Sequence, residues 1–308
     1  SGFFNLSQPE VNIFRSGIWD KLSPNLRGII WLVTGTFLFS SVDAVVKHLG
    51  QSFHPFELAF FRYFIGTIIL LPIFIRLGTR GMRTNIFGLH LLRLGLAYIA
   101  QLCIFIAIIY MPLADATALS FSKPLFTTMA AVIILSEVVR KARWVATGVG
   151  LIGVLVMIRP GTGAVDPVAF LAIFSALTFA FGNVLIRVLA RTEPMTRILF
   201  YYHAGGLVVG LFTVIWVWKT PVGFEWFFLI AIGVITTMGM TCYVKAFSVG
   251  EASAVGPSEY IRLIYAAVFG YFIFSETPDL WTIVGATIIV GAALFIARDE
   301  ARTNPQPR

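Results

Sequence analysis

The chain has 308 residues, of which 58% are hydrophobic and 12% are charged. Because soluble globular proteins carry about 25% charged residues, this composition excludes an ordinary soluble enzyme and predicts an integral membrane protein. The net charge of +8 does not indicate nucleic-acid binding, since the basic residues lie in short segments between apolar stretches.

The first 27 residues contain no uninterrupted apolar stretch, because charged residues divide them. We therefore expect no cleavable signal peptide here. Four apolar residues recur at helical spacing and predict a short helix on the cytoplasmic membrane surface. They are Phe14, Ile18, Trp19 and Leu22.

Ten stretches of mainly apolar residues follow, and each is close to the roughly 20 residues that a helix needs to cross a bilayer. They cover residues 28–49, 55–77, 86–110, 113–135, 141–159, 167–190, 195–218, 223–248, 251–275 and 280–298. Several connections are only a few residues long, so consecutive helices must run antiparallel. The sequence predicts an all-α membrane protein with ten transmembrane helices.

The second half of the chain repeats the first. Residues 108–137 reappear as residues 247–276, a shift of 139 positions that makes Lys123 equivalent to Arg262. Each half holds five predicted helices, and an odd number forces the two repeats into opposite orientations about an axis in the membrane plane. We therefore expect two inverted five-helix repeats, with the substrate site between them near the middle of the membrane.

The same pattern predicts the division of the chain. The expected parts are a cytoplasmic N-terminal segment (1–27), the first repeat (28–159), a loop (160–166), the second repeat (167–298) and a cytoplasmic tail (299–308). In the short segments at and between the ends of the predicted spans, 16 basic residues lie on the side of the N-terminus and three on the opposite side, namely Lys47, Arg159 and Lys219. The positive-inside rule then places both termini in the cytoplasm, and we expect a multi-pass protein of the bacterial inner membrane.

The remaining four basic residues lie within predicted spans, namely Arg62, Arg93, Lys123 and Arg262. A charge there costs at least about 2.5–3.5 kcal/mol, so it faces the protein interior or finds a partner. Lys123 and Arg262 lie roughly 15 Å deep by helical rise. As equivalent residues of two repeats, they are expected to line one substrate cavity; a purely structural ion pair is the alternative.

Glu259 precedes Arg262 by one helical turn, so the two could neutralise each other. Its equivalent in the first repeat is Ser120. In the substrate-binding interpretation, Lys123 and Arg262 hold a carboxylate or phosphate and Glu259 holds an amino group. The remaining expected binding residues are deep aromatic or imidazole side chains, for which packing is the alternative. They are Tyr202, His203, Tyr260 and Tyr265.

Four more residues are expected to be structural or to couple transport to an ion. Asp43 and Arg62 lie at similar depth and predict an ion pair. Glu137 and Glu276 close equivalent Ser-Glu motifs at helix ends on opposite membrane faces, which favours structural anchors over ion binding. The sequence contains no phosphate-binding loop, nucleophile elbow or metal-ligand cluster, so we expect no enzyme activity, no cofactor and no metal.

These features resemble the EamA-type drug/metabolite transporter superfamily over Arg27 to Arg298, because ten spans form two halves and Ser-Glu closes the fourth span of each. The segments His54–Arg62, Ser120–Phe126 and Tyr271–Glu276 resemble the branch that includes S-adenosylmethionine carriers of intracellular bacteria. This chain departs from those carriers at Lys123, where they have an apolar residue.

The resemblance implies a secondary transporter that moves a small polar organic metabolite by alternating access. The substrate would be amino-acid-like, nucleoside-like or S-adenosylmethionine-like. An exporter of amino acids or organic anions with the same fold is one alternative, and a non-transporting membrane assembly or binding subunit is another. The expected partners are the small-molecule substrate and membrane lipids, without nucleic acid, and a homodimer is left open.

Overall fold

The computed structural model describes residues 22–136, 141–158, 166–249 and 256–303. Within these ranges the secondary structure is helical, without a strand, so the predicted all-α class is confirmed. The surface helix predicted in the N-terminal segment, most of the loop between the halves, and Glu137 lie outside the described residues.

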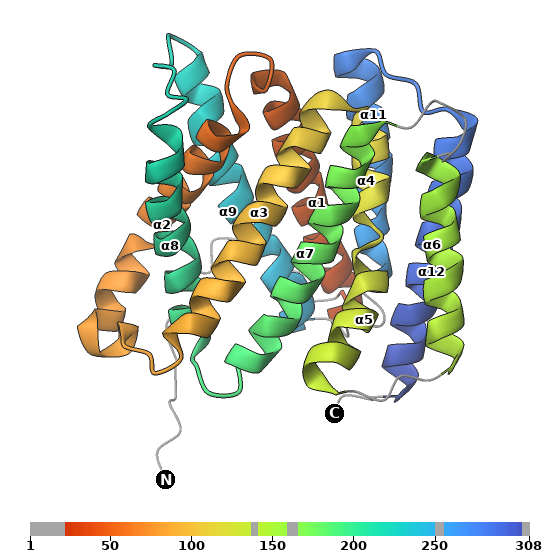
Figure 1. Ribbon diagram of the computed structural model, residues 1–308, viewed down its shortest axis with the longest axis horizontal. Helices are drawn as coiled ribbons and strands as arrows, with labels where there is room; N and C mark the ends of the chain where they lie inside the picture. The colour runs from red at the N-terminus through yellow and green to blue at the C-terminus, as the bar shows by residue number, and fades with distance from the viewer. Residues whose placement is uncertain (1–21, 137–140, 159–165, 250–255, 304–308) are drawn as a thin grey trace.

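The helices follow the predicted apolar stretches in order (Figure 1). Their bounds are α1 (Pro24–Leu49), α2 (Pro55–Met82), α3 (Phe87–Tyr110), α4 (Leu113–Ser120), α5 (Lys123–Leu135), α6 (Lys141–Ile158), α7 (Pro167–Leu189), α8 (Met195–Val214), α9 (Glu225–Val249), the 3-10 helix η2 (Gly256–Tyr260), α11 (Ile261–Phe274) and α12 (Leu280–Thr303). In Figure 1, α1 begins and α12 ends at the lower end of the bundle.

Seven helical segments in the described residues are long and apolar enough to cross a membrane. They are Pro24–Leu49, Pro55–Arg76, Phe87–Tyr110, Leu113–Leu135, Pro167–Ile186, Met195–Val214 and Glu225–Ala246. Two shorter apolar helices, Trp144–Ile158 and Leu280–Phe295, lie side by side in α6 and α12. The protein therefore spans the membrane several times, and the count of ten remains a prediction.

Two of the predicted spans are interrupted at equivalent positions. Phe121 and Ser122 separate α4 from α5, and Tyr260 ends the 3-10 helix η2 directly before α11. Phe121 and Tyr260 are separated by 139 residues, the shift that relates the two halves. Each break places a cationic residue at the start of the following helix: Lys123 is the first residue of α5, and Arg262 is the second of α11.

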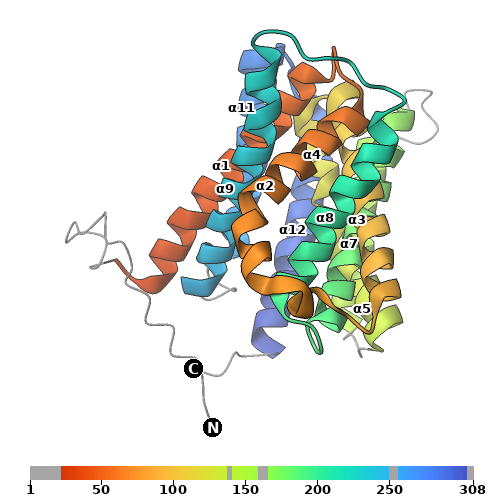
Figure 2. The ribbon, with the colours of Figure 1, turned by 90° about the vertical axis from the view of Figure 1, so that its left-hand side faces the viewer.

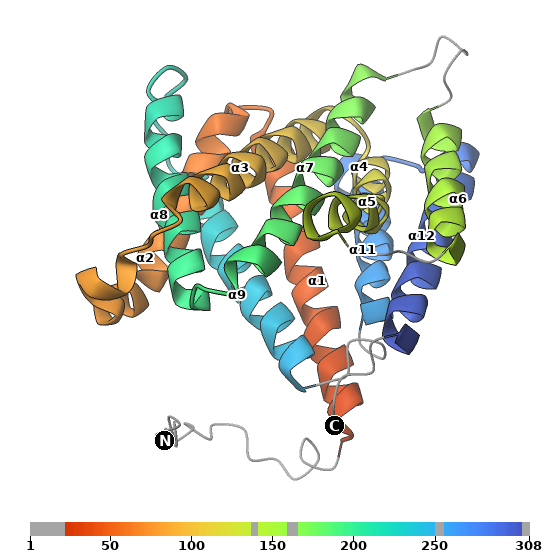
Figure 3. The same cartoon turned by 60° about the horizontal axis from the view of Figure 1, so that its bottom comes forward.

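The helix pairs pack across the two halves of the chain. The most extensive contacts join α1 with α9, α3 with α7 and α2 with α8 (Figures 2 and 3), and α6 with α12 (Figures 1 and 3). Glycine allows the closest approaches, because a Cβ on Gly206 of α8 would lie 2.4 Å from the Tyr63 ring of α2. A Cβ on Gly285 of α12 would lie 2.7 Å from the Gly153 carbonyl oxygen of α6. Small residues thus bring the halves into backbone contact.

Candidate functional site

A cavity of about 310 Å³ lies among α1, α2, α3, α4, α5, α7, α9, η2 and α11. We call it the central cavity. Its polar lining residues come from both halves of the chain. They are Asp43, Arg62, Gln101, Ser120, Lys123, Ser175, Asn183, Thr236, Tyr243, Glu259 and Arg262.

Four pairs of equivalent residues line the central cavity together. Each pair is separated by 139 residues, and the pairs are Gln101 with Met240, Ile104 with Tyr243, Ser120 with Glu259, and Lys123 with Arg262. The cavity is therefore built from matching positions of the two halves, with different side chains at each position.

Asp43 and Arg262 form an ion pair across two helices. An Asp43 carboxylate oxygen lies 2.6 Å from Nη2 of Arg262, and the Ser40 hydroxyl donates to the Arg262 carbonyl at 3.4 Å. The predicted Asp43–Arg62 pair is therefore wrong, and Arg262 forms its ion pair with Asp43 and not with Glu259. α1 packs against α11, and the rotation of each helix about its own axis turns Arg262 toward Asp43. Depth along a helix, the only quantity used in the prediction, does not fix that rotation.

Glu259 has a weaker polar environment than Arg262. Its carboxylate accepts a hydrogen bond from the Tyr243 hydroxyl at 3.4 Å, near the upper limit for such a contact. Ser120, its equivalent in the first half, donates its hydroxyl to the Ala116 carbonyl of its own helix at 2.8 Å. Glu259 is therefore available to a cationic group in the cavity.

Arg62 and Lys123 also line the central cavity. Within the described part of the chain, neither side chain has a carboxylate within ion-pair distance. Nη1 of Arg62 is buried without a hydrogen-bond partner, and its guanidinium lies 5.7 Å from the centre of the Tyr63 ring. The structure thus leaves these two cations, and not Arg262, with unpaired charge in the cavity.

Tyr202 and His203 lie apart from the cavity lining, in an aromatic cluster between α2, α3 and α8. The Tyr63 hydroxyl donates to the Tyr202 hydroxyl at 3.3 Å, and Arg93 stacks 4.3 Å from the centre of the Tyr202 ring. The His203 ring lies 5.1 Å from the Tyr202 ring. These contacts are those of a packed interface between helices.

The other two predicted tyrosines also contact aromatic rings outside the cavity lining. The Tyr260 ring lies 5.0 Å from Phe121, its equivalent in the first half. The Tyr265 ring meets Phe37 edge-on at 5.4 Å.

Glu276 connects several helix ends at one end of the bundle. It accepts the backbone N–H of Leu113 at 2.8 Å and pairs with Lys47 at 2.5 Å. Lys47 also donates to the Met111 carbonyl. These bonds join α1, α3, α4 and the residues that follow α11. Its predicted counterpart, Glu137, lies outside the described residues.

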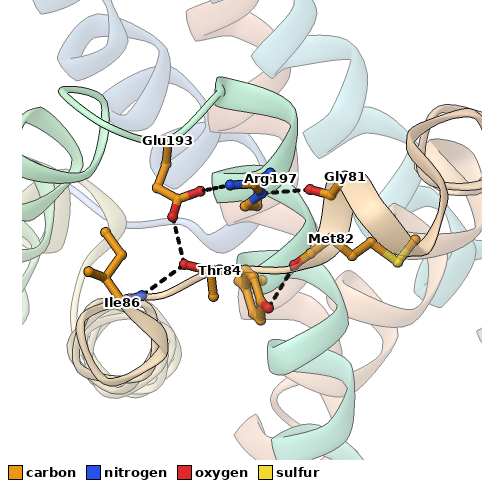
Figure 4. Close-up of polar contacts among 7 residues, drawn as sticks. Gly81, Met82, Thr84, Ile86, Glu193 and Arg197 are labelled. Atoms are coloured by element: carbon orange, nitrogen blue, oxygen red, sulfur yellow. Dashed lines mark hydrogen bonds and ion pairs between the residues drawn. The ribbon is translucent and has the colours of Figure 1, made fainter.

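A second polar cluster lies at the opposite end of the bundle, where α7 ends and α8 begins (Figure 1), and Figure 4 shows its contacts. Glu193, in the turn between α7 and α8, accepts from Thr84 at 2.6 Å and pairs with Arg197. Arg197 also donates to the Gly81 carbonyl at 2.6 Å. Burial raises the pKa of Glu193, but the hydrogen bonds from Thr84 and Arg197 outweigh it and hold this pKa below the ordinary value.

The prediction missed five polar residues of the cavity: Gln101, Ser175, Asn183, Thr236 and Tyr243. A signal for two of them is present in the sequence. Gln101 and Asn183 carry amide side chains within predicted spans, where an amide needs a polar neighbour or a wet cavity. Gln101 is buried in α3, and Asn183 is exposed in α7.

The two halves also match a known family. The sequence model of the EamA-like transporter family matches residues 26–159 and, separately, residues 167–298. The chain belongs to this family. It is a transmembrane transporter of the drug/metabolite type, and the resemblance drawn from the sequence is confirmed.

Three similar proteins carry different names within one class. The S-adenosylmethionine uptake transporter of Rickettsia prowazekii is 36% identical over 284 residues, which are 92% of this chain and 97% of that protein. The riboflavin transporter of Brucella anthropi is 30% identical and aligns over 80% of this chain and 89% of its own length. The pseudopaline exporter CntI of Pseudomonas aeruginosa is 30% identical and aligns over 89% of this chain and 96% of its own length.

A solved crystal structure shares the fold of this EamA-family chain. It covers 91% of this chain and 99% of its own, with a TM-score of 0.61 and 19% identity. The likeness concerns the fold alone.

Proposed function

We propose that this EamA-family transporter moves a small polar organic metabolite across the bacterial inner membrane by alternating access at the central cavity. S-adenosylmethionine is the first candidate substrate. The proposed architecture has ten spans, in which residues 28–159 and 167–298 form two inverted five-helix repeats, with both termini in the cytoplasm. The observation that carries the proposal is the polar central cavity, because equivalent residues of both halves line it.

Contacts between equivalent residues support the inverted repeat. Two residues related by a twofold axis touch each other only where they lie beside that axis. Tyr63 hydrogen-bonds to Tyr202, and the Phe121 ring contacts Tyr260, with 139 residues between the partners in both pairs. These two contacts therefore mark where the proposed axis runs.

The helix packing supports the same axis. Exchanging the halves turns the α1–α9 pair into the α7–α3 pair, and both pairs pack closely. The exchange maps the α2–α8 pair and the α6–α12 pair onto themselves, as expected for helices that face each other across the axis.

A departure from this symmetry supports alternating access. α1 packs against α3, but their equivalents α7 and α9 have no comparable packing over their described residues. Asn183 of α7 and Met240 of α9 line the cavity and are exposed. At the opposite end, Lys47, Met111 and Glu276 join the helix ends. We infer a cavity open toward the carboxyl ends of α7 and α9, and a second state in which the two repeats exchange these arrangements.

The cavity chemistry and the named relatives support the substrate class. The volume is near the lower end of the roughly 300–1,000 Å³ found for small-molecule sites. Carboxylate, guanidinium and ammonium groups line it, so it can hold both charged groups of an amino-acid moiety. The unpaired cations Arg62 and Lys123 favour a second candidate, an amino acid or organic anion without a sulfonium group.

Counterflow in proteoliposomes tests the proposal. Vesicles loaded with unlabelled S-adenosylmethionine are diluted into labelled S-adenosylmethionine, and we expect transient accumulation of label above equilibrium that protein-free vesicles do not show. Accumulation of labelled amino acids instead would support the second candidate. Saturable binding to the purified protein without counterflow of any tested compound would contradict transport and support a binding subunit.

A further inference from the structure

Five charged side chains line the central cavity, and they differ in whether a partner already neutralises them. Asp43 and Arg262 neutralise each other at 2.6 Å. Glu259 has one long hydrogen bond, from Tyr243 at 3.4 Å. Arg62 and Lys123 have no carboxylate partner in the described residues, and Nη1 of Arg62 is buried without any acceptor. The cavity therefore holds three cations and two carboxylates.

From this division we infer that Arg62 and Lys123 form the subsite for a carboxylate or phosphate of the substrate, and that Glu259 with the Tyr243 hydroxyl receives its amino group. Asp43 and Arg262 are then a structural pair. The inference rests on the proposed function, since it assumes that the central cavity holds the substrate. The sequence analysis assigned the anion-binding role to Lys123 and Arg262, and this inference replaces Arg262 with Arg62.

The free-energy cost of recruiting each cation decides between Arg62 and Arg262. A substrate carboxylate that binds Arg262 must compete with Asp43, and separating this part-buried ion pair costs free energy because the buried Asp43 loses its counter-charge. Binding to Arg62 breaks no ion pair and gives its buried Nη1 an acceptor that it otherwise lacks. Nε of Arg262 is also buried without a partner, so the ion pair with Asp43 is what distinguishes the two residues. Arg62 also presents a planar fork that matches a carboxylate or phosphate in two hydrogen bonds.

The decisive experiment compares two ligands that differ by one carboxylate. Binding of S-adenosylmethionine and of its decarboxylated analogue is measured by calorimetry on the purified, full-length protein. A charge-assisted hydrogen bond contributes about 1.5–3 kcal/mol, so we expect the unmodified protein to prefer the carboxylate-bearing ligand by about 10-fold or more. In Arg62→Gln and in Lys123→Gln this preference should fall toward 1, through weaker binding of S-adenosylmethionine alone.

The control is Arg93→Gln, because Arg93 also lies within a span but stacks on Tyr202 outside the cavity lining. It should keep the preference of the unmodified protein. Arg62→Lys should keep part of the preference, since it retains the charge without the fork. If Arg62→Gln weakens both ligands equally, or neither, the subsite is wrong. If Arg62→Gln does not fold, Lys123→Gln tests the subsite instead. This variant should fold, because the Lys123 side chain has no hydrogen-bond partner to lose in the described structure.

A second measurement needs no substrate, so it tests the anion subsite independently of the proposed substrate. Ser120→Cys is made in a Cys103→Ala, Cys242→Ala background, and its modification rates by anionic and cationic methanethiosulfonates are compared. For a separation of about 8 Å and an effective dielectric constant of about 40, loss of one unit positive charge changes the local energy of each reagent by about 1 kcal/mol, in opposite directions for the anion and the cation. The ratio of their rates therefore changes by about 2 kcal/mol, or roughly 30-fold. We expect Arg62→Gln to lower the anionic-to-cationic ratio by this amount and Arg93→Gln to leave it unchanged. If the unmodified protein binds neither ligand, the proposed substrate is wrong, while the rate ratio still decides the anion subsite: an unchanged ratio in Arg62→Gln overturns it.

Discussion

Tyr63 and Tyr202 occupy equivalent positions of the two halves, and the hydroxyl of one donates a hydrogen bond to the hydroxyl of the other at 3.3 Å. The bond lies in a packed interface, since a Cβ on Gly206 would clash with the Tyr63 ring. Equivalent side chains thus hold the two halves together directly.

Removing either hydroxyl should destabilise the protein modestly and non-additively. A neutral hydrogen bond contributes about 0.5–1.5 kcal/mol, and loss of one partner already breaks it. We expect Tyr63→Phe and Tyr202→Phe each to lower the melting temperature by about 2–4 °C, as judged from domains of similar size. The double variant should lie close to the more affected single variant. Fully additive shifts would show that the two hydroxyls do not depend on each other.

Breaking the Asp43–Arg262 pair should destabilise the protein strongly. Asp43→Asn leaves the part-buried guanidinium of Arg262 without its counter-charge, which costs at most the roughly 3–5 kcal/mol of a fully buried pair. We expect a large fall in melting temperature for Asp43→Asn, with partial recovery in Asp43→Asn combined with Arg262→Gln. Lys123→Gln is the matched control, because it also removes a cavity charge but breaks no ion pair, and its melting temperature should stay near that of the unmodified protein. A similar fall in that control would argue against the structural role of the pair.

Weakening the Lys47–Glu276 pair should favour the second state of the transporter. Glu276→Gln removes the counter-charge of Lys47, which helps to close one end of the bundle. Ile109 is buried there against the end of α1, next to Gly50. We expect Ile109→Cys, in the background without native cysteines, to react faster with a membrane-impermeant thiol reagent when Glu276→Gln is present. Unchanged reactivity would mean that this ion pair does not control access.

Low pH should weaken the cluster around Glu193. The pKa of Glu193 is below its ordinary value in the folded protein, so its contribution to stability is present above the unfolded pKa of about 4.3 and is lost as the pH falls through the lower folded value. At pH 7 we expect Glu193→Gln to melt at a lower temperature than the unmodified protein. The difference should shrink progressively below about pH 4. A difference that is constant with pH would show that the carboxylate charge is irrelevant to the cluster.

The sequence predicted the helices and the equivalent positions of the two halves better than it predicted the contacts between helices. Hydrophobic stretches and short connections predict helices because both depend on local residues. The common shift of 139 residues also identified Lys123 and Arg262 as equivalent, and both do line one cavity.

The rotation of each helix about its own axis could not be predicted in this way. Asp43 and Arg62 lie at matching depths, yet Asp43 bonds to Arg262, because α1 packs against α11. Tyr202 is deep in a span but contacts Tyr63 and not the cavity, because equivalent helices meet at that position. Such partners depend on packing between segments that are distant in the chain, and a single sequence does not reveal that packing.

The contacts between equivalent residues also bear on how such a chain can arise. Under the proposed inversion, one five-helix half meets a second in the opposite orientation along Tyr63–Tyr202 and Phe121–Tyr260. Two copies of a single half, inserted in opposite directions, would present the same positions to each other, Tyr63 to Tyr63 and Phe121 to Phe121. A half-length ancestor that enters the membrane both ways could thus assemble with itself before gene duplication and fusion fixed one orientation for each copy. The unequal partners Lys123 and Arg262, or Ser120 and Glu259, then record what fusion permits: each side of one cavity can change without changing the other.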